Sequence, residues 1–151
     1  MAELNGLSIV SAVTKKLRDN LSNKEIAAIY KDRPKQNVIK PYIMVHQING
    51  THTPELRKRG RRDYIIDVRC HPKDNQDNKI SWCSLLAEKL INILETITLL
   101  DGTHDVIKAR NIEWRVENEV LHVICYYSIK VIKESEDIPR MNDMSYGSRI
   151  K

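Results

Sequence analysis

Cysteine and histidine, the residues that most often hold metal ions, are few in this sequence and poorly spaced for a shared site. Cys70 is followed directly by His71, and His122 precedes Cys125 by three positions. The alternating pattern around both pairs predicts strands, in which residues an odd number of positions apart point to opposite faces of the sheet. No two cysteines have the short spacing that is typical of zinc sites. We therefore expect no bound metal.

The three cysteines, Cys70, Cys83 and Cys125, are far apart, and each lies within an apolar pattern. An odd number at such spacing predicts reduced thiols in the core rather than a disulfide framework. Burial disfavours the thiolate, so none of them is expected to be a nucleophile. The glycines, at positions 6, 50, 60, 102 and 147, are not clustered, so a glycine-rich phosphate loop is excluded. We expect no cofactor.

Acidic residues near predicted strand ends allow one enzymatic alternative, a metal-dependent nuclease. Its metal ligands would be Asp101, Asp105 and Glu113, with Lys108 or Arg115 as the neighbouring cation. The spacing matches no usual acid-x-Lys strand motif, and acids at junctions between loops and strands are commonly solvated. A basic DNA-binding or nuclease domain is therefore kept as an alternative, and a protein without catalytic residues is expected.

The densest charge lies in the run ELRKRGRRDY, residues 55–64, which holds five cations within six positions: Arg57, Lys58, Arg59, Arg61 and Arg62. Three interpretations are open. The cations could neutralise nucleic-acid phosphates, keep a solvated loop open, or dock onto an acidic protein surface. The run has no interleaved aromatic residues to stack on single-stranded bases, and it falls in a predicted loop rather than on a helix that could enter a groove.

The composition indicates one folded domain. The chain has 151 residues, of which 41% are hydrophobic and 30% charged, and its formal net charge is +5. Phenylalanine is absent, so Ile, Leu and Val must build the core. No apolar run reaches the ~18 residues needed to cross a bilayer, and the N-terminus lacks a signal-peptide pattern. A cytosolic protein without membrane contact is expected.

Hydrophobic periodicity divides the chain into blocks of helix and strand. The predicted elements are a helix over residues 8–21, a short strand within 25–30, strands over 41–48 and 64–71, a helix over 79–99, and strands over 105–116 and 120–133. The two middle strands form a hairpin whose long loop, residues 49–63, carries the basic run. The last strand is apolar on both faces, so it belongs inside the sheet. The order predicts an α+β fold, with a mixed, mainly antiparallel sheet of four to five strands and two helices packed on one face.

The domain is expected to span residues 1–133, followed by a C-terminal arm or flexible tail, residues 134–151. The apolar residues of this arm follow no helical or strand period: Met141, Met144, Tyr146 and Ile150. A polar segment of this kind does not bury enough apolar surface to fold alone. We expect it to order on a neighbouring subunit.

In this order, the elements resemble the tail terminator (tail completion) proteins of phages and phage-like contractile particles of Gram-positive bacteria. The resemblance covers about residues 8–133. It rests on the N-terminal helix, on Ala28-Ile29-Tyr30, and on the segments KPYIMVHQI, RRDYIIDVRCHP, SWCSLLAEKLINILETI and VLHVICYYSIKV.

The resemblance implies a structural protein with no catalytic residues and no cofactor. In that family, copies form a hexameric ring that caps the finished tail tube, stops its polymerisation and offers the surface that joins the head. The partners would be further copies of the chain, the tail tube protein, the sheath protein and the head-tail connector, with DNA only as passing content of the lumen. The protein would act in the host cytoplasm during assembly and then at the head-proximal end of the tail.

The resemblance also implies places for the two unusual segments. The hairpin loop would face the lumen or the tube below, and the C-terminal arm would lie on an adjacent subunit or on the sheath protein. Another connector or adaptor protein of the same particle is the second alternative.

Overall fold

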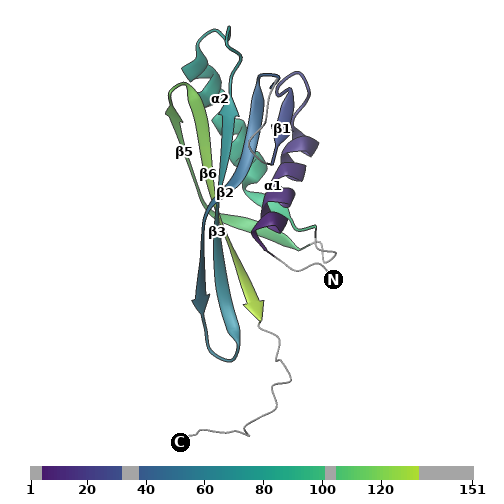
Figure 1. The fold of residues 1–151 in the computed structure, drawn as a ribbon, viewed down its shortest axis with the longest axis vertical. Helices are drawn as coiled ribbons and strands as arrows, with labels where there is room; N and C mark the ends of the chain where they lie inside the picture. The colour runs from purple at the N-terminus through teal and green to yellow at the C-terminus, as the bar shows by residue number, and fades with distance from the viewer. Residues whose placement is uncertain (1–4, 32–37, 101–104, 133–151) are drawn as a thin grey trace, which may run out of the picture.

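The computed structural model describes residues 5–31, 38–100 and 105–132 (Figure 1). Its elements, in chain order, are α1 (Gly6–Asn20), β1 (Ala28–Tyr30), β2 (Tyr42–Pro54), β3 (Arg59–His71), α2 (Lys79–Leu94), β4 (Thr96–Thr98), β5 (Val106–Glu117) and β6 (Val120–Ile132). The strands form one sheet in the order β1-β2-β3-β6-β5-β4. β1 pairs with β2 in parallel, and the other pairings are antiparallel. The predicted α+β class is confirmed, with six strands among the described residues instead of four to five.

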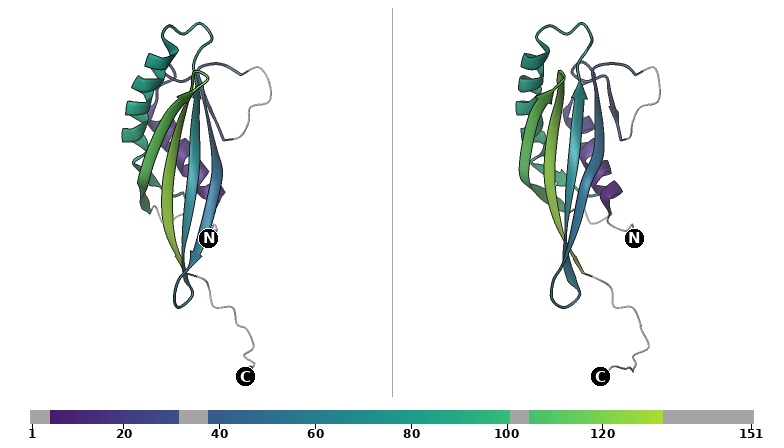
Figure 2. Two further views of the ribbon diagram at one scale, coloured as in Figure 1. Left: turned by 90° about the vertical axis from the view of Figure 1, so that its left-hand side faces the viewer. Right: turned by 60° about the vertical axis from the view of Figure 1, so that its left-hand side comes forward.

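Both helices pack on the same face of the sheet (Figure 2). α1 begins with a capping box, in which the Asn5 side chain accepts a hydrogen bond from the Ser8 backbone and the Ser8 hydroxyl accepts one from the Asn5 backbone. The residues of α1 buried against the sheet recur at helical spacing: Ile9, Val10, Ala12, Val13, Thr14 and Leu17. Within the described ranges, no helix is long and apolar enough to cross a membrane.

β6 lies inside the sheet, between β3 and β5, as its two apolar faces predicted. Its fully buried side chains alternate along the strand and face the helices: Leu121, Val123, Cys125 and Tyr127. The Tyr127 hydroxyl donates a hydrogen bond of 2.7 Å to the Leu94 carbonyl at the end of α2. β6 follows β5 through the turn Asn118-Glu119, whose positive φ angles of 52° and 61° suit a two-residue hairpin turn.

The second helix is shorter than the sequence predicted. α2 ends at Leu94, and the last residues of the expected helix over 79–99 form β4 instead, which pairs with the start of β5. The β-branched run Thr96-Ile97-Thr98 favours a strand. At the other end of the helix, in its first turn, Ile80 is 63% exposed.

The β2–β3 hairpin is also longer than predicted, and its loop is shorter. β2 continues to Pro54 and β3 begins at Arg59, so the prediction of a loop over residues 49–63 is wrong. Only residues 55–58 connect the two strands. The strands stay paired to their ends because backbone hydrogen bonds do not require an apolar face.

The far end of this hairpin extends beyond both helices (Figure 1). There, residues 49–54 of β2, 59–65 of β3 and 128–132 of β6 form a three-stranded unit, which we call the distal ribbon. β1 pairs only with residues 42–44 of β2, and β5 pairs with β6 only as far as Tyr127. Among the described residues, the distal ribbon therefore has one unpaired edge on β2 and another on β6.

Candidate interface at the tip of the hairpin

The five cations predicted as an interface lie together at the tip of the distal ribbon, but not in one loop. Only Arg57 and Lys58 are in the turn, where their φ angles are 59° and 64°. Arg59, Arg61 and Arg62 belong to β3. Because side chains alternate along a strand, Arg59 and Arg61 share one face of the ribbon and Arg62 lies on the other. The structure thus places positive charge on both faces of the tip.

Part of this charge is neutralised within the ribbon. The Arg61 Nε lies 3.4 Å from the Asp63 carboxylate. The Arg62 Nε donates a hydrogen bond of 3.3 Å to the Nδ1 of His52 on the neighbouring strand. Among the described residues, the cations of the run that have no carboxylate partner are Arg57, Lys58, Arg59 and Arg62. The tip therefore keeps a net positive charge at the surface.

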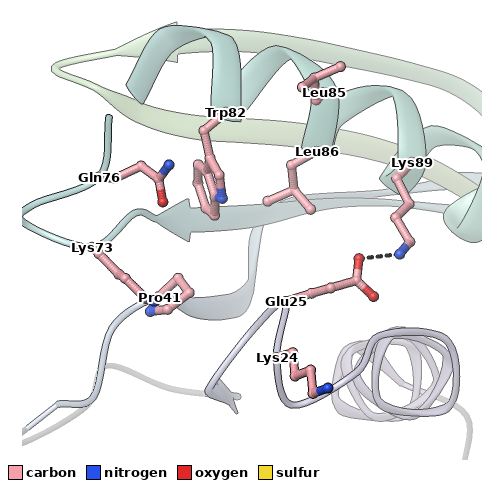
Figure 3. A pocket seen from close by; sticks show the side chains of 9 residues that line it. All are labelled: Lys24, Glu25, Pro41, Lys73, Gln76, Trp82, Leu85, Leu86 and Lys89. Carbon is pink, nitrogen blue, oxygen red and sulfur yellow. Dashed lines mark hydrogen bonds and ion pairs between the residues drawn. The ribbon is translucent and has the colours of Figure 1, made fainter. Parts of the chain in front are cut away.

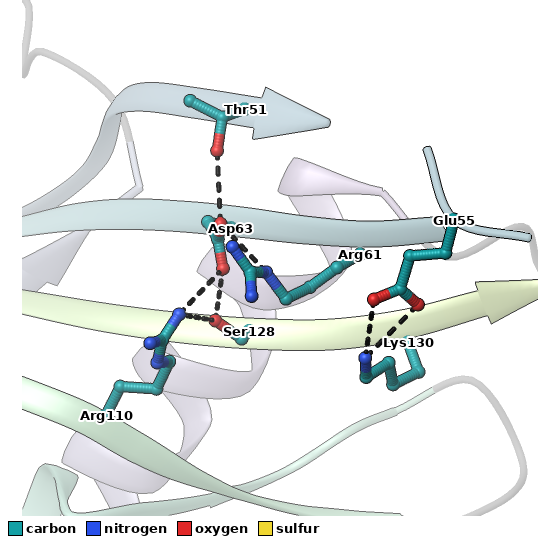
Figure 4. Close-up of polar contacts among 7 residues, drawn as sticks. All are labelled: Thr51, Glu55, Arg61, Asp63, Arg110, Ser128 and Lys130. Atoms are coloured by element: carbon teal, nitrogen blue, oxygen red, sulfur yellow. Dashed lines mark hydrogen bonds and ion pairs between the residues drawn. The ribbon is translucent and has the colours of Figure 1, made fainter. Parts of the chain in front are cut away.

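A groove of about 470 Å³ lies at this tip and is lined by His52, Pro54, Glu55, Lys58, Arg59, Gly60, Arg62, Val131 and Ile132. The His52 ring covers Gly60, since a Cβ added there would lie 2.7 Å from the ring and 3.3 Å from a methyl group of Val131. Glu55 is the acid of this lining, and it accepts hydrogen bonds of 2.9 and 3.2 Å from the Lys130 ammonium (Figure 4). The lining thus includes apolar residues, which we call the floor, and cations, which we call the rim. We name this groove the tip groove.

The face of the sheet that the helices leave uncovered carries a polar network centred on Asp63 of β3 (Figure 4). Its carboxylate accepts hydrogen bonds from the hydroxyls of Ser128 on β6 and Thr51 on β2, the latter at 3.2 Å. Arg110 of β5 lies 3.5 Å from the same carboxylate. The hydrogen bond from Ser128, together with the charges of Arg61 and Arg110, lowers the pKa of Asp63 despite its partial burial. This one side chain links four strands.

A second acid, Asp67, is almost fully buried on the same face, with 5% of the residue exposed. Its Oδ2 lies 3.3 Å from His122 Nδ1, 3.5 Å from Arg69 Nη2 and 3.9 Å from His46 Nε2. Its Oδ1 has no hydrogen-bond partner among the described residues. His122 therefore lies on an interior strand beside a buried carboxylate.

A separate shallow hollow lies beside α2, where the turn before β1 approaches the helix (Figure 3). The Lys89 ammonium of α2 pairs with the Glu25 carboxylate of that turn, and this hydrogen bond is the main reason why the pKa of Glu25 is lowered. Trp82, Leu85 and Leu86 form the apolar side of the hollow. The ion pair bridges two elements, and we assign it a structural role.

The three cysteines are buried and free, as predicted. Burial raises the pKa of the Cys70 thiol well above its usual value, and it raises that of Cys125 to about 12. Burial also raises the pKa of Cys83. In the part of the chain that the structure describes, no group of three or more His, Cys, Asp or Glu side chains is arranged to hold a metal ion.

Three of the described residues considered for a nuclease site have separate local partners. Lys108 of β5 pairs with Glu95 at 3.9 Å, and Glu113 accepts a hydrogen bond of 3.0 Å from the Tyr126 hydroxyl. Arg115 pairs with Glu117, its neighbour on the same strand, at 3.4 Å. Lys108, Glu113 and Arg115 thus each have a local structural partner.

Two groups of predicted residues lie outside the described residues. They are Asp101 of the nuclease alternative and the apolar residues of the C-terminal arm, Met141, Met144, Tyr146 and Ile150. The interface role of the arm therefore stays a prediction. The networks around Asp63 and Asp67 were not predicted, because their members come from four separate segments and no local spacing marks them.

Comparisons with known proteins found a matching family model and a solved structure of similar fold. The sequence model of a family described as "Phage tail terminator protein" matches residues 8–139. Among solved structures, a chain from the "Virion of native gene transfer agent (GTA) particle" has the same fold, with a TM-score of 0.55 at 13% sequence identity. That match covers 87% of this chain and 100% of the other. A comparison with curated protein sequences found no match.

The family match spans nearly the whole described domain, including both helices, the projecting hairpin and the interior strand β6. It agrees with the resemblance seen in the sequence and assigns the chain a structural role in a phage-like tail. The chain belongs to the phage tail terminator protein family.

Proposed function

We propose that copies of this chain close into a hexameric ring at the head-proximal end of a phage-like tail, where the ring caps the tail tube and ends its polymerisation. Family membership supports a terminator role for the chain as a whole. One structural observation supports the ring, which is that the distal ribbon offers two different unpaired strand edges.

The two edges differ in position and in sequence. Among the described residues, residues 45–54 of β2 and residues 128–132 of β6 each pair with β3 alone. Unpaired N–H and C=O groups along an edge readily pair with another chain. A contact between two different edges is heterologous, so every copy repeats it with the next. A heterologous contact whose rotation closes produces a ring.

In the proposed ring, the basic tips dock onto an acidic surface of the tail tube protein or line the lumen. Charge sets the register and orientation of such a contact, and apolar groups supply most of its affinity. The opposite side of the ring does not accept another tube subunit, so polymerisation ends there. This mechanism needs geometry alone, without a catalytic group or cofactor.

Further contacts follow from the same arrangement. The C-terminal arm, residues 134–151, lies on an adjacent copy or on the sheath protein, with Met141, Met144, Tyr146 and Ile150 as its apolar contacts. The head-proximal side of the ring meets the head-tail connector. DNA passes through the lumen if the particle carries it.

Light scattering after size-exclusion chromatography, with negative-stain imaging, tests the ring. We expect a particle with the mass of six chains and a central opening. Adding the purified protein to growing tail tubes should shorten them. A protein that stays monomeric at every concentration and leaves tube length unchanged would refute the proposal.

The role of the tip is tested by replacing three of the cations without carboxylate partners, in the variant Arg57→Ser/Lys58→Ser/Arg59→Ser, while Arg62 keeps its hydrogen bond to His52. Arg61 is left in place because it pairs with Asp63. A matched control replaces three cations away from the ribbon: Lys16, Lys24 and Lys73. We expect the tip variant to fold but lose tube capping, and the control to cap normally. Tubes of normal length from the tip variant would contradict the assignment.

A further inference from the structure

The tip groove has the chemistry of a site for a short acidic peptide that also carries an apolar side chain. Pro54, Gly60 and Val131 contribute apolar lining, while Lys58, Arg59 and Arg62 supply positive charge. Among the described lining residues the only acid is Glu55, and it is already bound to Lys130, so it does not oppose an incoming carboxylate. An acidic residue would meet a basic rim there, and an aliphatic one would meet the floor.

The same chain contains such a peptide just beyond β6. Residues 134–138 read Glu-Ser-Glu-Asp-Ile, with three carboxylates and one branched aliphatic side chain. We propose that the tip groove binds residues 134–138 of a neighbouring copy. This inference rests on the proposed ring, in which each copy would place its residues 134–138 in the groove of one neighbour and bind the same segment of the other neighbour in its own groove.

The geometry of β6 favours a neighbour over the same chain. β6 runs toward the tip, because Ile132 pairs with Arg59 at the start of β3. Ile132 itself lines the groove, so residues 134–138 could enter their own groove only if the chain reversed directly after the strand. Residues 133–138 contain no Gly or Pro, the two strongest turn formers, although Ser135 and Asp137 also occur in turns, and the first proline after the strand is Pro139. An extended chain advances by about 3.3 Å per residue, so a segment that continued the direction of β6 would come within reach of another copy, which is the arrangement that we propose.

Complementary charge supplies the selectivity of this contact. In this contact, the three acids of the segment face the three cations of the rim, Lys58, Arg59 and Arg62. Of these cations, Arg62 has a hydrogen bond to His52 within the ribbon. Such rim charges orient a partner and speed its association more than they hold it. The contact is therefore expected to weaken with salt, because raising the ionic strength shortens the range of these attractions.

Disulfide trapping tests the contact in the full-length protein. One variant carries Lys58→Cys, a second carries Glu136→Cys, and the two are mixed under mild oxidation. The native cysteines are buried and do not compete. We expect disulfide-linked dimers from this mixture, and at least a tenfold lower yield when Lys24→Cys replaces Lys58→Cys as the matched exposed control. In the double variant, links between copies should give a ladder of oligomers.

Charge reversal provides a second arm. Glu134→Lys/Glu136→Lys/Asp137→Lys, probed with cysteines at positions 58 and 135, should reduce trapping to the level of the control. Combining this triple variant with charge reversals of two rim cations, Arg59→Glu and Arg62→Glu, should restore part of the yield. A yield of disulfide-linked dimers that neither reversal changes would overturn the proposal.

The outcomes of the trapping experiment distinguish the groove contact from the proposed ring. Closed rings without trapped dimers would overturn the groove contact and leave the ring intact. Trapped dimers in a protein that forms no ring would sustain the groove contact and refute the ring. A disulfide formed only within single chains of the double variant would show that the segment folds onto its own groove, and would overturn the inference.

Discussion

Replacing Asp63 by Asn is expected to weaken the uncovered face of the sheet without altering its shape. The carboxylate accepts hydrogen bonds from Ser128 and Thr51 and pairs with Arg61 and Arg110. An amide of the same size keeps one acceptor oxygen but loses the charge. The four strands would then stay paired while the link between their side chains is partly lost.

The expected cost follows from these partners. A hydrogen bond to a charged group contributes ~1.5–3 kcal/mol when it is largely shielded from water, and a neutral one about 0.5–1.5 kcal/mol. The two arginine contacts add little, because both arginine side chains are more than a third exposed and exposed pairs are worth at most ~1 kcal/mol. We therefore expect Asp63→Asn to lower the free energy of unfolding by about 1–2 kcal/mol, mainly through its contact with Ser128.

Urea denaturation at two protein concentrations measures this change, since assembly would make stability depend on concentration. Asp74→Asn is the matched control, because it removes the same charge from an exposed residue whose partner, Lys40, lies 2.8 Å away at the surface. The control is expected to unfold at the same urea concentration as the natural protein.

The pH dependence gives the prediction a second test. The folded-state pKa of Asp63 is lowered, so its contribution is present in full above the unfolded pKa of about 3.9. It is lost as the pH falls through the lowered folded pKa, because the folded and unfolded states then bind the proton equally. The difference between the natural protein and Asp63→Asn should therefore shrink in strong acid. An Asp63→Asn variant as stable as the Asp74→Asn control at pH 7 would refute the reasoning.

Two further predictions concern the core. Tyr127→Phe removes the hydroxyl that binds the Leu94 carbonyl, so a buried carbonyl loses its partner. In urea denaturation this variant should lower the free energy of unfolding by about 1–3 kcal/mol. The control is Tyr126→Phe, on the uncovered face of the sheet, which should lower it by less. At pH 8, Cys125 in the folded protein should react with a thiol reagent on the order of a thousandfold more slowly than in urea, because burial raises its pKa to about 12. Rapid labelling of Cys70 or Cys125 without unfolding would contradict their assignment to the core.

The sequence predicted the part of the fold in which side chains pack against one another. Ile9, Val13 and Leu17 recur at helical spacing because they face the sheet, and Val123 and Cys125 alternate because they face the helices. In such segments the hydrophobic pattern directly reports the surface that is buried. The α+β class, the position of β6 and the family resemblance all depended on these segments.

The distal ribbon could not be predicted in the same way. The outer half of β2 has no apolar face, with Thr51 and Thr53 on one side, and β3 begins with arginines. Both features reflect that no helix covers this part of the sheet. A strand held by backbone pairing alone has no hydrophobic period, so the sequence predicts a loop there. The end of α2 was missed for a related reason, since Ile97 is buried and fits a helical or a strand pattern equally well.

The candidate site depends on contacts that local sequence does not contain. The tip cations could be located from their spacing, but the groove beneath them is formed by β2, β3 and β6 together. The Asp63 network likewise requires the pairing of four strands. Side-chain chemistry was therefore visible in the sequence, whereas its arrangement on two faces of a ribbon followed only from the fold.

The energetics of the proposed ring assign different roles to the ribbon and to residues 134–138. The ribbon is already ordered by its pairing with β3, so its edges lose little conformational entropy when another copy binds. Fixing the backbone of one residue costs about 1–2 kcal/mol, so ordering a five-residue segment opposes binding by roughly 5–10 kcal/mol. Exposed ion pairs return at most ~1 kcal/mol each, and burying one isoleucine about 1.5–3 kcal/mol. The segment alone therefore cannot hold two copies together. The strand edges must supply most of the affinity, and the segment selects the correct neighbour and orientation.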